Sequence, residues 1–193
     1  MGDSVEIERR FLVDMGSLPQ IRQSVTSAVE IRQWFPPVAE VELLPEQRAL
    51  SLSGRVMIEG IPEKDWTEVC SLISSGIGVR VRLMQGKATL TVKGPWDGIS
   101  RAEFEWPVDS ALVQQFGENY EWPGISKRRL FYPLGNNLIC EVDVFAGQLD
   151  GLVIAEVELG STEITFDLPR WFGEEVTGKT EWGNSSLAKN GFS

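Results

Sequence analysis

The sequence predicts a mainly β domain of the α+β class, in which about eight antiparallel strands form a barrel or a tightly curved sheet with few helices. Charged residues stand two positions apart from Glu6 to Arg10 and along at least six later stretches, mostly with Val, Ile, Leu, Phe or Ala between them. Because side chains two apart in a strand share a face, each stretch has one charged and one apolar face. Clusters of Gly, Pro and Asn between the stretches supply the turns.

The first 76 residues are predicted to hold one long strand, a mixed segment, and a separate part with its own hairpin and helix. The strand covers about residues 4–13, and the mixed segment ends where Pro36 and Pro37 stop it. Residues 48–58 have the pattern of a short hairpin. Residues 62–75 are expected to be helical, because apolar residues recur there at helical spacing, namely Trp66, Val69, Cys70 and Ile73.

From Gly78 onward strands dominate the prediction. One helix is expected from Asp109, the N-cap, to about Phe116, and short helices are expected over residues 170–176 and 185–189. The predicted strands cover about residues 78–84, 87–93, 99–108, 127–133, 137–145 and 151–159.

The charges within each predicted strand are sorted by sign. Alternation alone also fits an antiparallel sheet with one face wetted by solvent. Like charges on one face repel, however, so same-sign pairs favour a site that holds a multivalent cation and a polyanion. In a closed barrel the charged faces would line one shared channel. The same-sign pairs are Glu6/Glu8, Arg80/Arg82, Lys127/Arg129, Glu141/Asp143 and Glu156/Glu158.

Composition narrows the possible functions. The length of 193 residues fits one domain, and a net charge of −10 argues against nonspecific binding to nucleic acid or to an anionic membrane. No apolar run approaches the roughly 20 residues of a membrane span, and the N-terminus is acidic, so we expect a cytoplasmic protein. Histidine is absent, which leaves carboxylates, Lys, Arg or a metal for catalysis. Cys70 and Cys140 are expected to be buried structural thiols.

Seven short motifs follow one another along residues 4–35 and 78–192. They are Glu6-Ile-Glu8-Arg-Arg10, Gly-Val-Arg80-Val-Arg82, Leu-Thr-Val-Lys93-Gly, Ile-Ser-Arg101-Ala-Glu103-Phe-Glu105, Glu141-Val-Asp143-Val-Phe, Ile-Ala-Glu156-Val-Glu158-Leu and Trp171-Phe-Gly-Glu-Glu-Val. This ordered series resembles the blocks of the CYTH superfamily, also called triphosphate tunnel metalloenzymes, and in particular the bacterial inorganic triphosphatases. Residues 1–193 would then form a single domain with an apparent insertion at about 38–76.

The resemblance implies an eight-stranded antiparallel closed β-barrel, a tunnel, that hydrolyses a triphosphate with Mg²⁺ or Mn²⁺. It assigns the metal to Glu6, Glu8, Glu156 and Glu158, and catalysis to Glu6, Glu8, Lys127 and Arg129. The substrate, a small polyanion such as tripolyphosphate, would be bound by Arg10, Arg80, Arg82, Lys93, Arg101, Lys127 and Arg129. A second metal, the orientation of basic side chains or the positioning of water would fall to Glu103, Glu105, Glu141 and Asp143.

The chain departs from the family pattern at two places. Arg10 stands where the ExExK signature has Lys, and because arginine stays protonated it cannot accept a proton. Proton handling then shifts to metal-activated water, with Lys127 or Lys93 assisting, and Arg10 could instead form a structural ion pair with a carboxylate. The insertion could cover a tunnel mouth or pad the outer wall, and its apolar helix stripe favours padding.

Three functions stay open at this stage. The first is metal-dependent hydrolysis of inorganic tripolyphosphate. The second is an adenylate cyclase or a nucleoside or thiamine triphosphatase of the same superfamily. The third is a non-catalytic module that binds polyphosphate or nucleotide.

Overall fold

A computed structural model describes residues 5–192 of the chain. The backbone divides into two compact units. Within the described residues, unit 1 comprises 32–95 and 102–124, and unit 2 comprises 5–31, 96–101 and 125–192. Helices are α1 (Leu18–Ile21), α2 (Glu63–Ser74), α3 (Ser110–Asn119) and α4 (Asn184–Asn190), and short 3-10 turns are η1 (Met15–Ser17), η2 (Val38–Glu40), η3 (Pro45–Gln47), η4 (Gly147–Leu149) and η5 (Thr180–Trp182).

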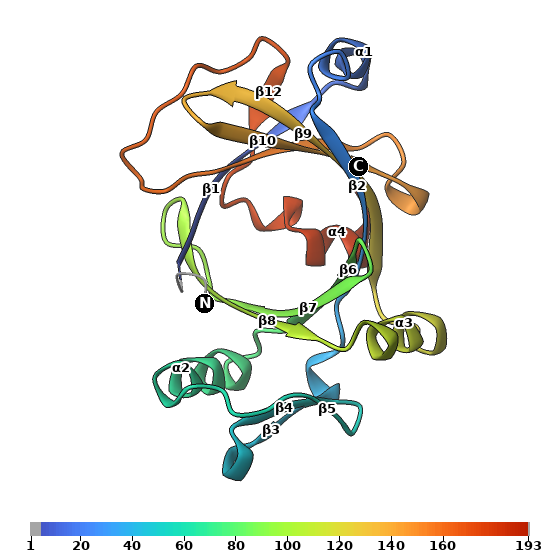
Figure 1. Cartoon of the computed structure of the whole chain (residues 1–193), viewed down its shortest axis with the longest axis vertical. Helices are drawn as coiled ribbons and strands as arrows, with labels where there is room; N and C mark the ends of the chain where they lie inside the picture. Colours follow the sequence, from blue (N-terminus) through green and yellow to red (C-terminus); the bar gives the residue numbers. More distant parts are fainter. Residues whose placement is uncertain (1–4, 193) are drawn as a thin grey trace. The chain divides into compact units, whose positions relative to one another are not determined.

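Eight antiparallel strands close on themselves, which confirms the predicted barrel (Figure 1). The strand order is β11-β10-β9-β2-β6-β7-β8-β1, β1 pairs back with β11, and β12 adds to β1. A separate sheet has the order β3-β4-β5. The strands are β1 (Val5–Val13), β2 (Ser27–Trp34), β3 (Val41–Leu44), β4 (Ala49–Leu52), β5 (Arg55–Ile58), β6 (Val79–Met84), β7 (Lys87–Lys93), β8 (Ser100–Val108), β9 (Gly124–Gly135), β10 (Leu138–Phe145), β11 (Val153–Glu158) and β12 (Phe172–Glu175).

In unit 2, the apolar faces of β1, β9, β10 and β11 pack into one core. Residues alternate along these strands, so the apolar side chains gather on one side and the charged ones on the other. Aromatic rings close the core, because Phe172 stacks on Phe11 with centroids 4.4 Å apart and Trp171 meets Tyr132 edge-on. The buried members include Phe11, Leu130, Cys140, Val142, Val153, Ala155 and Val157.

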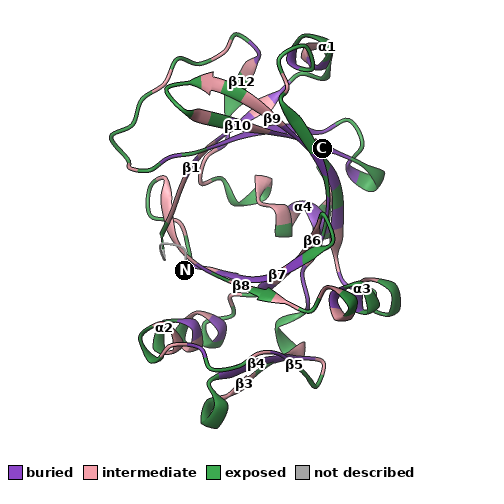
Figure 2. Cartoon of the chain, in the orientation of Figure 1, coloured by how far each residue is buried: buried purple, intermediate pink, exposed green. Residues whose placement is uncertain are grey.

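In unit 1, the segment 38–76, which the sequence predicts to be an insertion, packs against the apolar face of β6, β7 and β8. Val69 and Ile73 of α2 and Leu50 and Leu52 of β4 share one buried cluster with Leu90 of β7. Figure 1 shows α2, α3 and the β3–β5 sheet on the same side of β7 and β8, and Figure 2 shows that β7 is largely buried. The insertion therefore covers the apolar side of this part of the sheet, which is the padding role that its helix stripe favours.

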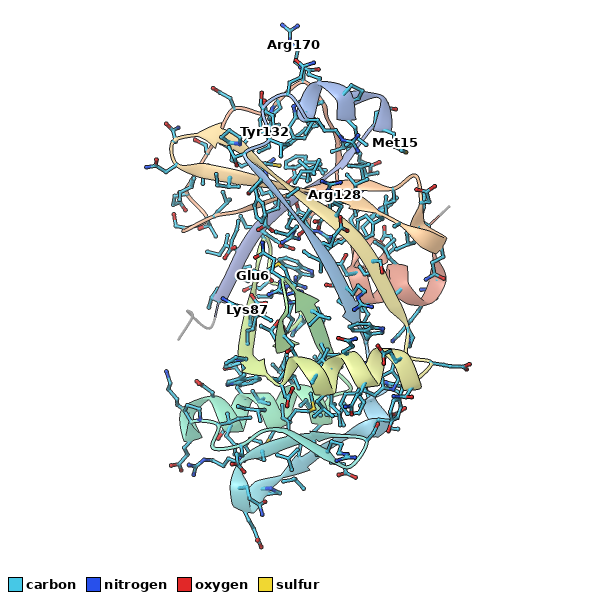
Figure 3. The ribbon with its side chains drawn as sticks, turned by 45° about the vertical axis from the view of Figure 1, so that its right-hand side comes forward. Glu6, Met15, Lys87, Arg128, Tyr132 and Arg170 are labelled. Atoms are coloured by element: carbon cyan, nitrogen blue, oxygen red, sulfur yellow. The ribbon has the colours of Figure 1, made fainter. Side chains whose placement is uncertain are left out.

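Three predictions about elements need correction. Residues 170–176 hold the strand β12 instead of a helix, and Arg170 just before it points away from the rest of its unit (Figure 3). The mixed segment after the first strand contains β2, and β9 is longer than predicted at both ends. Ser4, placed in the first predicted strand, lies outside the described residues.

The strand β3, which pairs with β4, was not predicted, whereas the other helices and strands lie close to their predicted positions. The carboxylate of Asp109 accepts hydrogen bonds from the backbone N–H groups of Ala111 and Leu112, as an N-cap does. Cys140 is fully buried as expected, whereas Cys70 is only partly buried. No helix within residues 5–192 is long and apolar enough to cross a membrane.

Candidate active site

Much of the charged face of unit 2 is buried, with Glu6 and Glu141 partly buried and Glu158 exposed, so it is not the solvent-wetted face that the alternative interpretation of the alternation required. Lys127 is 2% exposed and Asp143 is 0% exposed. Glu8, Arg10, Arg129 and Glu156 are also buried. Such a dense set of charges persists in a folded protein only when each charge is paired or hydrogen-bonded. The same-sign pairs of the sequence therefore meet pairs of opposite sign from other strands.

Antiparallel pairing of β1 with β11 sets the acidic part of this face. The register places Glu8 directly opposite Glu158 and Arg10 directly opposite Glu156. Two carboxylates opposite each other repel, which an intervening cation relieves. Arg10 and Glu156 form the complementary case, because Arg10 Nη2 lies 2.9 Å from Glu156 Oε1.

Arg10 is held by partners on several sides. Its Nη1 donates to the carbonyl of Trp182 at 3.0 Å, and its Nε lies 3.8 Å from Glu8 Oε1. Burial alone would lower the pKa of Arg10, but the attraction of Glu156 and Glu8 outweighs it and raises this pKa. The residue at the signature Lys position is thus a permanently charged partner of Glu156, which is the structural ion pair that the sequence left open.

Arg129 of β9 binds carboxylates of β10 and β11. Its Nε and Nη2 donate to the two oxygens of Asp143, both at 2.7 Å, and Nη2 also donates to Glu156 Oε2 at 2.7 Å. A further bond joins Nη1 to Glu141. Burial would lower the pKa of Arg129, yet Asp143, Glu156 and Glu141 together raise it well above its ordinary value. Arg129 therefore links three acids through one planar group, as bidentate guanidinium geometry allows.

Lys127 lies two residues before Arg129 on the same face. Its Nζ forms an ion pair with Asp143 and lies 5.3 Å from the centre of the Phe145 ring. Burial lowers the pKa of Lys127, and the attraction of Asp143 and Glu156 offsets this only in part. Lys127 is therefore the amine in unit 2 whose proton is held less tightly than usual.

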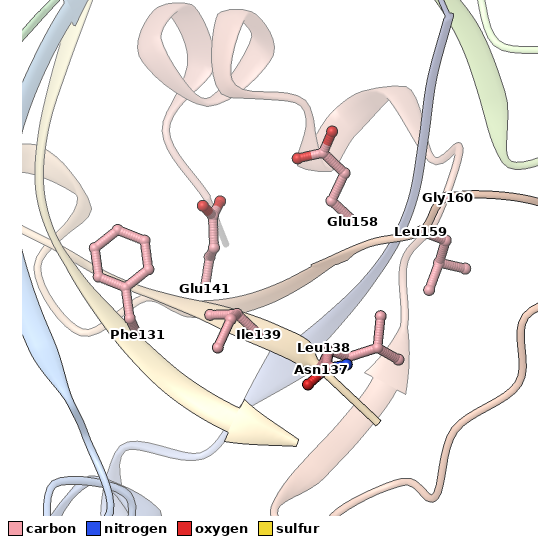
Figure 4. A pocket seen from close by; sticks show the side chains of 8 residues that line it. All are labelled: Phe131, Asn137, Leu138, Ile139, Glu141, Glu158, Leu159 and Gly160. Carbon is pink, nitrogen blue, oxygen red and sulfur yellow. The ribbon is translucent and has the colours of Figure 1, made fainter. Parts of the chain in front are cut away.

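A pocket of about 470 Å³ opens beside this network in unit 2. Figure 4 shows Glu141 and Glu158 on the same side of their strands, with Phe131 beside Glu141. Burial raises the pKa of Glu141, although Arg129 acts in the opposite direction. The pocket thus brings two acidic side chains of the predicted site to a shared opening.

The first two acids of β1 converge on Arg101. Arg101 Nε donates to Glu6 Oε2 at 2.7 Å, and its Nη2 lies 3.5 Å from Glu8 Oε1. The guanidinium stacks on Trp96, with Cζ 4.0 Å from the ring centre. One positive group therefore contacts both acids of the signature and balances part of their charge.

Unit 1 carries a second charged cluster on β6, β7 and β8. Arg80 Nη2 lies 2.9 Å from Thr91 Oγ1 and 3.3 Å from Glu105 Oε2, and Arg82 Nη2 lies 3.0 Å from the same oxygen. Lys93 pairs with Glu103 at 3.1 Å. Glu105 is the most exposed member, with 35% of its side chain accessible. The basic residues predicted for this unit thus share one face, with Glu103 and Glu105 as their resident partners.

No three His, Cys, Asp or Glu side chains in residues 5–192 are gathered as a formed metal cage. The donors nevertheless suit a hard divalent cation, because they are carboxylate oxygens and because Glu6 and Glu8 already share one cationic partner. Both oxygens of Glu156 are engaged by guanidinium groups, so this acid suits a metal less well.

Two residues of these clusters and one further buried polar side chain were missed in the sequence. Thr91 links Arg80 to Glu105, although its hydroxyl carries no charge that the alternation would reveal. Trp96 lies in the connection between β7 and β8, outside any strand pattern. Gln33 of β2 is 1% exposed, and its Nε2 has no hydrogen-bond partner among the described residues. The alternation of Val29, Ile31 and Gln33 with polar residues was the signal that would have found it.

Solved structures share this fold. A crystal structure of an inorganic triphosphatase matches with a TM-score of 0.53 and 25% identity, covering 97% of this chain and 95% of that one. A candidate adenylate cyclase from Bacillus halodurans matches with a TM-score of 0.51 and 16% identity over 84% of each chain, a likeness in fold alone. A closed barrel with buried rows of acids and bases defines the triphosphate tunnel class, the CYTH superfamily.

Curated sequences place the chain more closely. An inorganic triphosphatase from Acetivibrio thermocellus is 42% identical over 113 residues, which is 58% of this chain and 72% of that protein. One from Nitrosomonas europaea is 33% identical over 117 residues, or 60% of this chain and 77% of that protein. No model of a protein family matches the sequence. The chain belongs to the inorganic triphosphatase family of the CYTH superfamily.

Proposed function

We propose that this protein hydrolyses inorganic tripolyphosphate in a reaction that requires Mg²⁺ or Mn²⁺. The observation that carries the proposal is the buried charge network of unit 2, in which acidic and basic rows from four strands meet without histidine. Its relatives are named inorganic triphosphatases. Such a network suits phosphoryl transfer, because the transition state needs charge stabilisation and positioning more than covalent chemistry.

The acids of the site would divide into metal ligands and partners of the basic side chains. Glu6, Glu8 and Glu158 would hold the divalent ion, and Glu156 would join them only by giving up Arg10 or Arg129. When bound, the ion supplies a Lewis acid for phosphate oxygens and a lowered pKa for water. Glu103, Glu105, Glu141 and Asp143 orient the basic side chains in the resting protein.

The basic residues would bind phosphate oxygens of the substrate, which would replace some of the carboxylates that pair with these residues in the resting protein. In unit 2, Glu141 is the partner of Arg129 that substrate replaces, because 28% of its side chain is exposed whereas Asp143 is fully buried. In unit 1, Glu105 is the corresponding partner of Arg80 and Arg82. Lys93 and Arg101 contribute further positive charge. Arg10 stays with Glu156 and contributes its charge from there.

Lys127 is the group that we assign to proton movement. Its lowered pKa makes Nζ a better proton donor than an ordinary lysine, and Asp143 holds it in place. Arg10 cannot take this role, because a guanidinium with a raised pKa does not release its proton.

The test measures phosphate release from tripolyphosphate, ATP and thiamine triphosphate with Mg²⁺, with Mn²⁺ and without metal, together with cyclic AMP formed from ATP. We expect release from tripolyphosphate that depends on metal. Cyclic product would favour the cyclase alternative. Tight binding of tripolyphosphate without release in any condition would favour the binding module and contradict the proposal.

The Glu8→Gln variant tests the metal assignment. It should lower metal-dependent turnover by ~10²-fold or more, since one ligand to the ion loses its charge. Glu30→Gln is the matched control, because Glu30 is an acid on a strand of the barrel with 76% of its side chain exposed. Unchanged turnover in Glu8→Gln would remove Glu8 from the metal site.

A further inference from the structure

Arg101 contacts both Glu6 and Glu8, two of the acids proposed above to hold a divalent cation. Its Nε donates to Glu6 Oε2 at 2.7 Å, and its Nη2 lies 3.5 Å from Glu8 Oε1. Oxygen ligands surround Ca²⁺ at about 2.3–2.6 Å and Mg²⁺ at about 2.0–2.1 Å. An ion at such distances from Glu6 Oε2 and Glu8 Oε1 would overlap the guanidinium and repel it. Arg101 and a bound ion therefore cannot share these two oxygens.

The backbone brings Arg101 to this position. Residues 96–101 belong to unit 2, and the N–H of Glu8 donates to the carbonyl of Ile99 at 3.1 Å. Asp97 and Ser100 pair across the tight turn that precedes Arg101. The turn is thus tied to β1 at the middle of the acidic signature, and the side chain of Arg101 follows from that anchor.

A second partner holds the guanidinium from its other side. Arg101 Cζ lies 4.0 Å from the centre of the Trp96 ring, within the range of a cation–π contact. Trp96 has no carboxylate oxygen, so a divalent ion at Glu6 and Glu8 would not need this contact. It gives the guanidinium a partner that persists when the carboxylates are taken.

The charge of this cluster favours exchange with a divalent ion. Glu6, Glu8 and Glu158 contribute three negative charges, and Glu158 lies directly opposite Glu8. Arg101 contributes one positive charge, and Arg10, whose Nε lies 3.8 Å from Glu8 Oε1, is shared with Glu156. A divalent ion brings two, which neutralises the acids more completely, while Arg101 keeps a position on Trp96.

We propose that Arg101 is an exchangeable internal counter-cation, which pairs with Glu6 and Glu8 in the metal-free protein and is displaced from them when Mg²⁺ or Mn²⁺ binds. The inference rests on the proposed function, because it takes Glu6 and Glu8 as ligands of the ion. It adds that Arg101 sets the affinity of the site for the ion, by competing for the same oxygens.

The experiment measures Mn²⁺ binding directly, by the electron paramagnetic resonance signal of free Mn²⁺ in titrations of the full chain without substrate. Arg101→Met should bind Mn²⁺ about tenfold more tightly than the unmodified protein, which corresponds to about 1.4 kcal/mol. Arg101→Lys keeps the charge but cannot bridge both acids, so its affinity should fall between the two. Arg9→Met is the matched control, because Arg9 lies on β1 next to Glu8 but pairs with Glu175 instead.

The outcomes separate the two proposals. Suppose that Glu8→Gln abolishes Mn²⁺ binding but that both Arg101 variants bind Mn²⁺ no more tightly than the unmodified protein. This result overturns the role of Arg101 and leaves the metal site in place. If neither the unmodified protein nor Arg101→Met binds Mn²⁺, the proposed metal site itself fails. Thermal unfolding adds a readout: Arg101→Met should melt lower than the unmodified protein without metal, and Mn²⁺ should raise its melting temperature more.

Discussion

Replacing Arg129 with Met should destabilise the fold strongly. The substitution keeps a long apolar side chain but removes the group that donates to Asp143 at 2.7 Å from two nitrogens and to Glu156 at 2.7 Å. Asp143 is 0% exposed. Water cannot replace the lost donors there, and Lys127 and Arg10 are left to neutralise three acids. Arg129 thus tests whether the network is held by charge pairing.

The expected loss is about 3–5 kcal/mol of unfolding free energy, the cost of removing one partner of a buried ion pair. A domain of this kind has about 5–15 kcal/mol in total, so the loss is a large share of its stability. Arg9→Met provides a matched comparison, because Arg9 pairs with both oxygens of Glu175 at 2.8 and 2.6 Å but lies near the surface. The unfolding free energy of Arg9→Met should fall by less than about 1 kcal/mol.

The assay is urea unfolding of the unmodified protein and both variants at several pH values. Burial already raises the pKa of Glu141, and Arg129 acts against this, so without Arg129 the pKa of Glu141 should lie further above its unfolded value. The folded state then binds more protons than the unfolded state, so the stability of Arg129→Met should fall as the pH rises from 5 to 8. Arg129→Lys keeps one positive charge and should lose less.

Equal losses in Arg129→Met and Arg9→Met would refute this reasoning. A loss of unfolding free energy in Arg129→Met that is the same at pH 5 and pH 8 would also refute it, because a change in packing alone would produce such a loss. If Arg129→Met does not fold, the comparison of Arg129→Lys with Arg9→Lys keeps the same test.

Two further perturbations test the packing of α3 and the pKa of Glu141, a partner of Arg129. Gly117 lies within α3, where a Gly→Ala change would normally stabilise the helix by about 1 kcal/mol. Here the new Cβ would lie 2.3 Å from Cζ2 of Trp34, so thermal unfolding of Gly117→Ala should show a loss of about 1–3 kcal/mol in stability. A gain in stability would contradict the close contact. Glu141→Gln removes a carboxyl group. Burial raises the pKa of this group, so its contribution to stability falls as the pH rises above the ordinary pKa of a glutamate. The stability of this variant relative to the unmodified protein should increase from pH 4 to pH 7 in urea unfolding, and parallel pH curves would contradict the raised pKa.

Much of the fold was readable because strand alternation is a local property. In β6, Arg80 and Arg82 alternate with Val79 and Val81, and the structure has the strand where this pattern places it. The strand β12 was mistaken for a helix, because its four residues are too few to show either period clearly. The strand β2 escaped notice, although Val29 and Ile31 alternate in it with polar residues.

The candidate site was readable as a set of charged residues, but its pairing was not. The alternation identifies Lys127, Arg129, Glu141 and Asp143 as charged positions on strands. That Asp143 serves both Lys127 and Arg129 depends on the register of β9 with β10, which places Asp143 opposite Arg129. Nothing in the local pattern of either strand specifies that register.

The amino-acid order is sufficient for the period-two strands, the capped α3, the family motifs and the identity of the acids and bases, because each depends on residues close together in the chain. The partners of those charges required the folded chain. Arg10 meets Glu156, and Arg101 meets Glu6, across sequence separations of 146 and 95 residues. Burial and electrostatic pairing are properties of atoms that come close in space, and strand register in the closed sheet is what brings these atoms together.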